Sequence, residues 1–115
     1  MTNVFISTGG IRKNNAYETC LEFNKLGLKN FELSGGKYFK NVKNLLLELE
    51  KKGLRIQLHN YFPVPEKPFV LNLASLDKLI SKLSLEHCKK SIDIASKLSL
   101  KRYSVHAGFC IDPST

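Results

Sequence analysis

Two histidines fall at the ends of short, partly apolar segments of this chain of 115 residues. His59 closes the segment 54–59, and His106 lies near the end of the segment 102–107. Neutral imidazole is a good ligand for zinc, manganese, cobalt or iron, and it also exchanges protons near neutral pH. If the two segments are neighbouring strands about 4.8 Å apart, both rings can reach one ion or one substrate. The alternative is that each ring is a hydrogen-bonded structural residue.

Apolar and polar residues alternate in the segments that we expect to be strands. Because successive residues of a strand point to opposite faces, each of these strands has one apolar and one polar face. The predicted polar faces consist of Glu32 with Ser34, Gln57 with His59, and Ser104 with His106. Glu32 is the one carboxylate in this set. We interpret it as a general base, a metal ligand or a partner that fixes a histidine tautomer, the alternative being a satisfied buried carboxylate.

A loop of unusual composition follows His59. Asn60, Tyr61 and Phe62 form a polar and aromatic step, and three prolines then lead the chain to Asn72. Proline excludes helix and central strand from such a segment. We therefore expect this loop to form one wall of a pocket that contains His59.

The remaining candidate residues carry weaker signals. We expect His87 to lie on the surface or in helix packing, and Cys110 to have no role. The glycine pairs at 9–10 and 35–36 lack nucleotide-binding spacing, so they predict turns that offer at most backbone N–H groups to a phosphate. The three scattered cysteines indicate reduced thiols and a cytoplasmic protein.

The formal net charge of +8 admits two interpretations. We favour a solvated surface, because most lysines fall on predicted helix faces and helix ends; the alternative is a nucleic acid or another anionic partner. The sequence contains no apolar run of the ~20 residues needed to cross a membrane, and its start does not resemble a signal peptide.

Strands and helices alternate along the predicted chain. The Asn15 and Glu18 pair predicts a capping box at the start of the first helix, and Gly27 and Gly53 predict helix ends. We expect strands at 4–7, 31–34, 54–59 and 102–107, helices at 16–26, about 42–52 and 85–98, and a separate helical turn at 75–83. On the last helix, Leu85, Cys88, Ile92, Ala95 and Leu98 are expected to face the sheet.

This order predicts an α/β fold with parallel strands, either a barrel or a doubly wound sheet. A doubly wound sheet is covered on both faces and has almost continuously apolar strands. A barrel has helices on its outer face alone, and its inner face carries polar residues near the carboxyl ends of the strands. The polar faces therefore favour a TIM-type (βα) barrel, of which the single domain 1–115 provides the first four βα units.

The motifs FELSGG, LHNYFP, NLAS and YSVHAGF, in this order, resemble the N-terminal half of the xylose isomerase-like TIM barrel superfamily, closest to sugar phosphate isomerase/epimerase proteins. The resemblance spans about residues 3–112. It implies metal-assisted proton transfer next to a sugar carbonyl, with a divalent ion such as Mn, Zn, Co or Mg. It implies catalytic roles for Glu32 and His59, and His59 and His106 as metal ligands.

The same resemblance implies a set of substrate-binding residues around a sugar or sugar phosphate. Tyr61 and Phe62 are expected to stack on a sugar face. The predicted substrate-binding residues are Asn60, Tyr61, Phe62, Asn72 and Ser104.

The chain departs from this family in its length. Complete barrels of this type have eight βα units in about 250 residues, and the second half carries the main metal-binding carboxylates and the paired catalytic glutamates. We therefore expect a fragment, a truncated product, or a half barrel that associates with another chain, including a second copy. The alternatives are a zinc-dependent apurinic-site endonuclease, which ends the same two strands in histidine, and an inactive interaction module.

Overall fold

Four short parallel strands form a single sheet in the computed structural model, which describes residues 3–112. The strands lie in chain order, β1-β2-β3-β4, and each neighbouring pair is parallel. The elements are β1 (Ile6–Ser7), η1 (Thr8–Gly10), α1 (Ala16–Asn24), β2 (Asn30–Leu33), α2 (Val42–Lys51), β3 (Arg55–His59), α3 (Lys78–Lys97) and β4 (Tyr103–Ser104). The predicted α/β fold with alternating strands and helices is confirmed.

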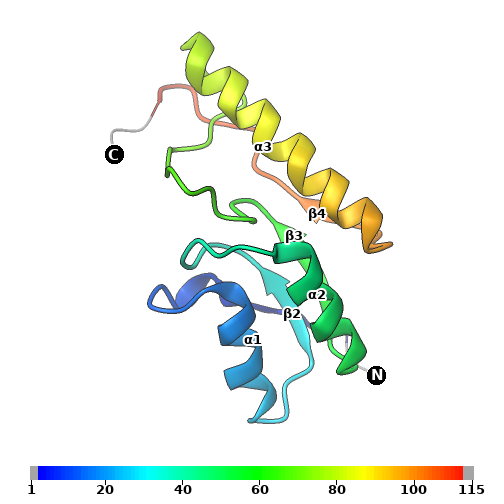
Figure 1. Cartoon of the computed structure of the whole chain (residues 1–115). Helices are drawn as coiled ribbons and strands as arrows, with labels where there is room; N and C mark the ends of the chain where they lie inside the picture. Colours follow the sequence, from blue (N-terminus) through cyan, green and yellow to red (C-terminus); the bar gives the residue numbers. More distant parts are fainter. Residues whose placement is uncertain (1–2, 113–115) are drawn as a thin grey trace.

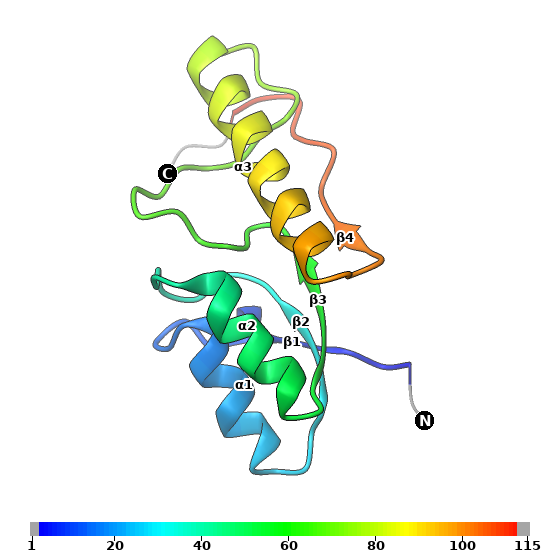
Figure 2. The ribbon, with the colours of Figure 1, turned by 45° about the vertical axis from the view of Figure 1, so that its right-hand side comes forward.

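The helices α1, α2 and α3 lie on the same side of the sheet (Figures 1 and 2). α1 and α2 cover β2 and the start of β3, whereas the longer α3 runs obliquely across β3 and β4 (Figure 1). The molecule is correspondingly elongated, with principal extents of 43 × 28 × 27 Å. The opposite face of the sheet is not covered by any helix that the structure describes.

The hydrophobic core lies between this layer of helices and the apolar face of the strands. Phe31 and Leu33 on β2 and Leu58 on β3 are fully buried there. The helices contribute Ala16, Cys20, Leu46, Leu49, Ile94 and Ala95, and Leu98 follows α3 directly. Burial alternates along β2 and β3, so the predicted separation of apolar and polar faces is confirmed for these two strands.

Local sequence signals explain where the first helices begin and end. The Asn15 side chain accepts a hydrogen bond from the Glu18 N–H at 2.8 Å, and Glu18 accepts one from the Asn15 N–H, which is the predicted capping box. Gly27 and Gly53 follow α1 and α2 with φ angles of +88° and +80°. Glycine adopts this left-handed conformation without the steric cost of a Cβ atom.

The structure corrects the prediction for the last helix. Residues 78–83 of the separate turn expected at 75–83 belong to α3, because Asp77 caps a continuous helix by accepting hydrogen bonds from Leu79 N–H and Ile80 N–H. The predicted apolar stripe is also partly wrong, since Leu85 and Ile92 are 50% and 54% exposed. The face that packs inward carries smaller and polar residues, namely Ser84, His87, Cys88, Ser91, Ile94 and Ala95.

The edge strands are shorter than predicted, and the sheet is open. β1 and β4 each contain two residues, and within residues 3–112 each pairs on one side only. A closed barrel is therefore not seen in the described part of the chain. In that part, no helix is both long enough and apolar enough to cross a bilayer.

Candidate functional site

A hollow of about 420 Å³ lies at the carboxyl ends of β2, β3 and β4. In parallel sheets this edge collects the side chains that follow each strand, and it is where ligands of α/β proteins bind. The lining consists of Ser34, Gly35, His59, Asn60, Tyr61, Phe69, Val70, Leu71, His106 and Phe109. We call this the histidine hollow.

His59 and His106 meet in the histidine hollow, as the sequence predicted for side chains at the ends of adjacent strands. Their ring centroids are 5.1 Å apart, with the planes at 88° in an edge-to-face arrangement. His59 ends β3 and is half-buried, whereas His106 follows β4 and is exposed. Register explains their meeting, because His59 pairs with Ser104 and His106 lies two residues further along the same face.

Hydrogen bonds from the neighbouring strand ends hold this pair. Ser34 Oγ lies 3.4 Å from His59 Nδ1 and donates to the Asn60 carbonyl at 3.4 Å. The Asn60 side-chain oxygen accepts from the His106 N–H at 3.4 Å. When the Ser34 hydroxyl donates to Asn60, its oxygen is free to accept an Nδ1–H of His59. That tautomer leaves the lone pair of His59 on Nε2.

Glu32 lies on the polar face of β2 but not among the residues that line the hollow. Its carboxylate accepts a hydrogen bond from Gln57 Nε2 at 3.0 Å, and the two residues are register partners on β2 and β3. The partner of the carboxylate is therefore Gln57, which lies two residues before His59 and on the same face of β3. The predicted catalytic role of Glu32 remains a prediction.

The aromatic step after His59 divides between the hollow and the core. Tyr61 lines the hollow, and its hydroxyl oxygen accepts a hydrogen bond from the Phe69 N–H at 3.0 Å. Burial raises the pKa of the Tyr61 hydroxyl, and the Phe69 N–H opposes this effect. Phe62 is fully buried against Phe39, at 6.1 Å between ring centroids. Of the two rings expected to stack on a sugar, only Tyr61 therefore reaches the hollow.

Asn72 is fully buried and joins two loops. Its Oδ1 accepts from Phe109 N–H at 2.8 Å and Ala74 N–H at 3.1 Å, and its Nδ2 donates to Asp112 Oδ1 at 2.8 Å and Phe109 O at 3.3 Å. These partners leave no group of Asn72 directed at the hollow, where substrate binding was predicted. Asn72 instead fixes Phe109, which lines the hollow. Ser104 is exposed on β4 beside His59 in register.

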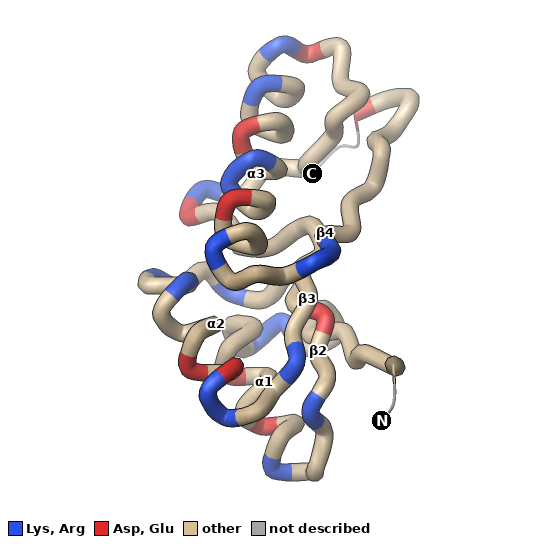
Figure 3. Tube along the Cα trace, turned by 90° about the vertical axis from the view of Figure 1, so that its right-hand side faces the viewer, with Lys and Arg blue, Asp and Glu red and all other residues tan. Residues whose placement is uncertain are grey.

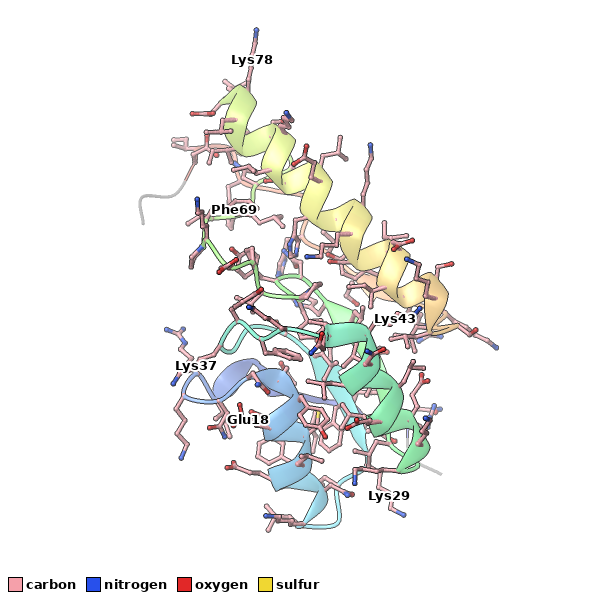
Figure 4. All side chains as sticks on the ribbon, viewed as in Figure 1. Glu18, Lys29, Lys37, Lys43, Phe69 and Lys78 are labelled. Carbon is pink, nitrogen blue, oxygen red and sulfur yellow. The ribbon has the colours of Figure 1, made fainter. Side chains whose placement is uncertain are left out.

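His87 is the residue near the hollow that sequence reasoning assigned only to surface or helix packing. It is 6% exposed on α3 and stacks on Tyr61 at 5.1 Å between ring centroids. Phe69 packs edge-on against the same ring at 6.4 Å, and lies on the loop segment beside α3 (Figure 4). The Nε2 atom of His87 is buried without a hydrogen-bond partner. Burial lowers the pKa of His87, and the positive charge of Lys90 lowers it further.

The described residues do not by themselves fit a catalytic metal ion. The predicted ligands His59 and His106 offer two nitrogens, whereas catalytic zinc sites have three protein ligands. Within residues 3–112 no group of three or more histidine, cysteine, aspartate or glutamate side chains is placed to hold an ion. The divalent metal thus remains a prediction.

Charge is distributed over the molecule rather than gathered at this site. Lysine and arginine are spread along α3, α2 and the turns in the view of Figure 3. The lining of the histidine hollow contains none. Comparisons of the chain with protein-family models, curated proteins and solved structures gave no match.

Proposed function

We propose that this chain carries one half of the active site of a sugar isomerase or epimerase, built on the first half of a TIM-type barrel. The observation that supports this proposal best is the contact of His59 and His106 at the carboxyl ends of adjacent parallel strands. The resemblance of the sequence motifs to xylose isomerase-like proteins points to the same edge of the sheet. No step of the proposal is assigned to a metal.

The reaction class follows from what two imidazoles in contact can do. Isomerisation or epimerisation removes a proton from the carbon next to a carbonyl and returns it to a neighbouring carbon or to the opposite face. A base and an acid that both exchange protons near neutral pH are needed at one place. In our proposal His59 Nε2 accepts the proton, because Ser34 engages Nδ1. His106 donates to the carbonyl oxygen.

The remaining lining suits a polyhydroxyl ligand. The Tyr61 and Phe69 rings provide flat apolar surface against which the C–H face of a sugar packs, and Ser34 and Asn60 provide hydrogen-bonding groups. Because no lysine or arginine lines the hollow, its composition favours a neutral sugar over a sugar phosphate. For the same reason it gives no support to the alternative of an apurinic-site endonuclease, which must hold a phosphate backbone.

The open polar face of the sheet supports completion by further strands. Glu32, Gln57 and His59 lie on a face that no described helix covers, and β1 and β4 each have one free edge within residues 3–112. In an eight-stranded barrel, such a polar face lies in the interior and every strand edge is paired. We propose that a second copy or additional βα units supply them. Light scattering after size exclusion distinguishes a 13.0 kDa monomer from a species of twice that mass.

Solvent exchange at the reacting carbon tests the activity. Aldoses, ketoses and their phosphates are incubated with the protein in D₂O, with EDTA or with Mn²⁺, Zn²⁺, Co²⁺ or Mg²⁺. Proton NMR then follows deuterium at the carbon next to the carbonyl. We expect exchange with at least one neutral sugar, reduced at least 100-fold in His59→Asn, the loss typical of a general base.

The matched control is Glu86→Gln, an exposed substitution on α3 outside the hollow, which should exchange like the wild type. Absence of exchange by the self-associated protein under every metal condition would refute the proposal. So would an equal rate in wild type and His59→Asn. A shift from no exchange in EDTA to exchange with one ion would support the predicted metal requirement.

A further inference from the structure

The packing of His87 against the wall of the histidine hollow gives this fold a titratable contact. His87 lies on α3, about midway along the helix, and its ring faces the loop that connects β3 to α3. Tyr61 and Phe69 of that loop both contact the ring, and both line the hollow. One buried side chain of α3 therefore supports two residues of the pocket wall.

The surroundings of His87 suit a neutral ring and not a charged one. The Nε2 atom is buried without a partner, so a proton added there has neither water nor an acceptor to stabilise it. The His87 carbonyl lies 3.0 Å from Ser91 Oγ, whose one proton it shares with the Phe62 carbonyl, and this contact involves the backbone of the helix and not the ring. A protonated ring in this position gains stability by leaving the contact and reaching solvent.

The charged and titratable groups around the ring do not compensate a positive charge. Lys90, one turn further along α3, is itself positive and acts on His87. From the loop, the titratable group that faces the ring is the Tyr61 hydroxyl, which already accepts the Phe69 N–H. The charged residues of this loop, Glu66 and Lys67, are exposed.

We propose that His87 is a pH-sensitive contact that, while neutral, holds the loop segment between Phe62 and Phe69 against α3, and that protonation of the ring releases this segment and opens the histidine hollow. Other contacts anchor the two ends of this segment: the Tyr61 carbonyl accepts from Gly35 N–H at 3.3 Å, and the Asn72 N–H donates to Ser84 Oγ at 2.9 Å. The carbonyl of the adjacent Phe62 accepts from Ser91 Oγ at 2.7 Å, and this buried bond keeps the base of the loop in place. The released segment is therefore the part beyond Phe62, whatever ligand the hollow binds.

Amide hydrogen exchange between pH 7.5 and 4.5 tests this inference, with each rate corrected for its intrinsic pH dependence. We expect the protection factor of the Phe69 amide to fall by roughly tenfold or more as His87 becomes protonated, because the protonated ring favours the released loop. The amide of Leu58, buried on β3, should keep its protection. The ring signals of the chain's three histidines, assigned by substitution, report the protonation of His87 directly.

His87→Phe keeps a flat ring against Tyr61 but cannot be protonated, so its Phe69 amide should stay protected within about twofold across this pH range. His87→Gln serves the same purpose if the phenylalanine variant does not fold. Glu86→Gln, on the exposed side of the same turn, should respond to pH like the wild type.

Four results would overturn the inference. The first is a His87 ring that is protonated while the Phe69 amide stays protected. The second is an equal loss of protection in His87→Phe, and the third is a parallel loss at Leu58, which would mean that acid unfolds the whole domain. A ring that stays neutral down to pH 4.5 would equally remove the switch from any physiological range.

Discussion

Replacing Asn72 tests whether its buried side-chain amide stabilises the loops around the hollow and does not itself contact a ligand. The Asn72→Ala substitution removes four side-chain hydrogen bonds, two to the N–H groups of Ala74 and Phe109 and two from Nδ2 to Phe109 O and Asp112. Each such bond contributes about 1 kcal/mol net, which sets an upper value of about 4 kcal/mol. Phe109 and Asp112 are themselves exposed, so water replaces part of this loss. We expect a cost of about 2–3 kcal/mol.

The Asn72→Asp variant sharpens this test through charge. It keeps an acceptor for the two N–H groups but loses both donated bonds and places a second carboxylate beside Asp112, whose Oδ1 lies 2.8 Å from Nδ2. Two carboxylates at this distance repel, so the pKa of the pair is raised in the folded state relative to the unfolded chain. The resulting destabilisation is greatest at neutral pH and shrinks as the pH falls and the pair takes up a proton.

Urea unfolding followed by circular dichroism measures both variants, and Asn44→Ala on the exposed surface of α2 is the control. Asn44→Ala should lie within about 0.5 kcal/mol of the wild type, because an exposed helical asparagine has little to lose. The reasoning is refuted if Asn72→Ala is as harmless as the control. It is also refuted if Asn72→Asp shows no dependence on pH.

Three further predictions concern other parts of the fold. Gly108→Ala should cost about 2–3 kcal/mol in urea unfolding, since φ is +136° and a Cβ would lie 2.6 Å from Asn72 Oδ1, whereas Gly10→Ala meets nothing within 4 Å and should be tolerated. Asn15→Ala removes the capping box and should cost about 1 kcal/mol; a change below 0.3 kcal/mol would contradict the role of the cap. Because the pKa of His87 is lowered on folding, the unfolded chain binds more protons as the pH falls below about 6.5. The free energy of unfolding should therefore decrease over that range in the wild type and less so in His87→Phe.

The sequence predicted the strands and the first two helices because their signals are local. Asn15, Gly27 and Gly53 act on backbone groups within a few residues, so their meaning does not depend on the rest of the fold. The alternation on β2 and β3 likewise reflects a single apolar face. It was this alternation that placed His59 on the polar side and led to its contact with His106.

The inward face of α3 was not predictable from hydrophobicity. Leu85 and Ile92 suggested one stripe, whereas Ser84 and Ser91 lie on the face that is buried. Serine suits that face because its hydroxyl forms hydrogen bonds with buried backbone groups. Ser84 accepts from the Asn72 N–H, and Ser91 donates to the Phe62 carbonyl. These hydrogen bonds join residues far apart in the sequence, so no local sequence pattern predicts them.

The residues of the candidate site also differ in whether local sequence signals could predict their positions. The ends of β3 and β4 could be located, and with them the two histidines. The roles of Phe62, Asn72 and His87 depend on which side of the loop packs against the helices, and this is decided by tertiary contacts. A polar residue at the end of a loop, such as Asn72, carries the same sequence signal whether it contacts a ligand or a backbone.

The most direct test of the central claim, that His59 and His106 form one ligand site, is a titration of the protein with neutral sugars observed through the histidine ring signals. The chain has three histidines, so single substitutions assign the ring signals of His59 and His106. At constant pH, we predict that the ring signals of His59 and His106 shift together, with one dissociation constant, and that the shift of one is lost when the other is replaced. Signals that shift independently, or that do not shift with any sugar while other residues do, would contradict a shared site.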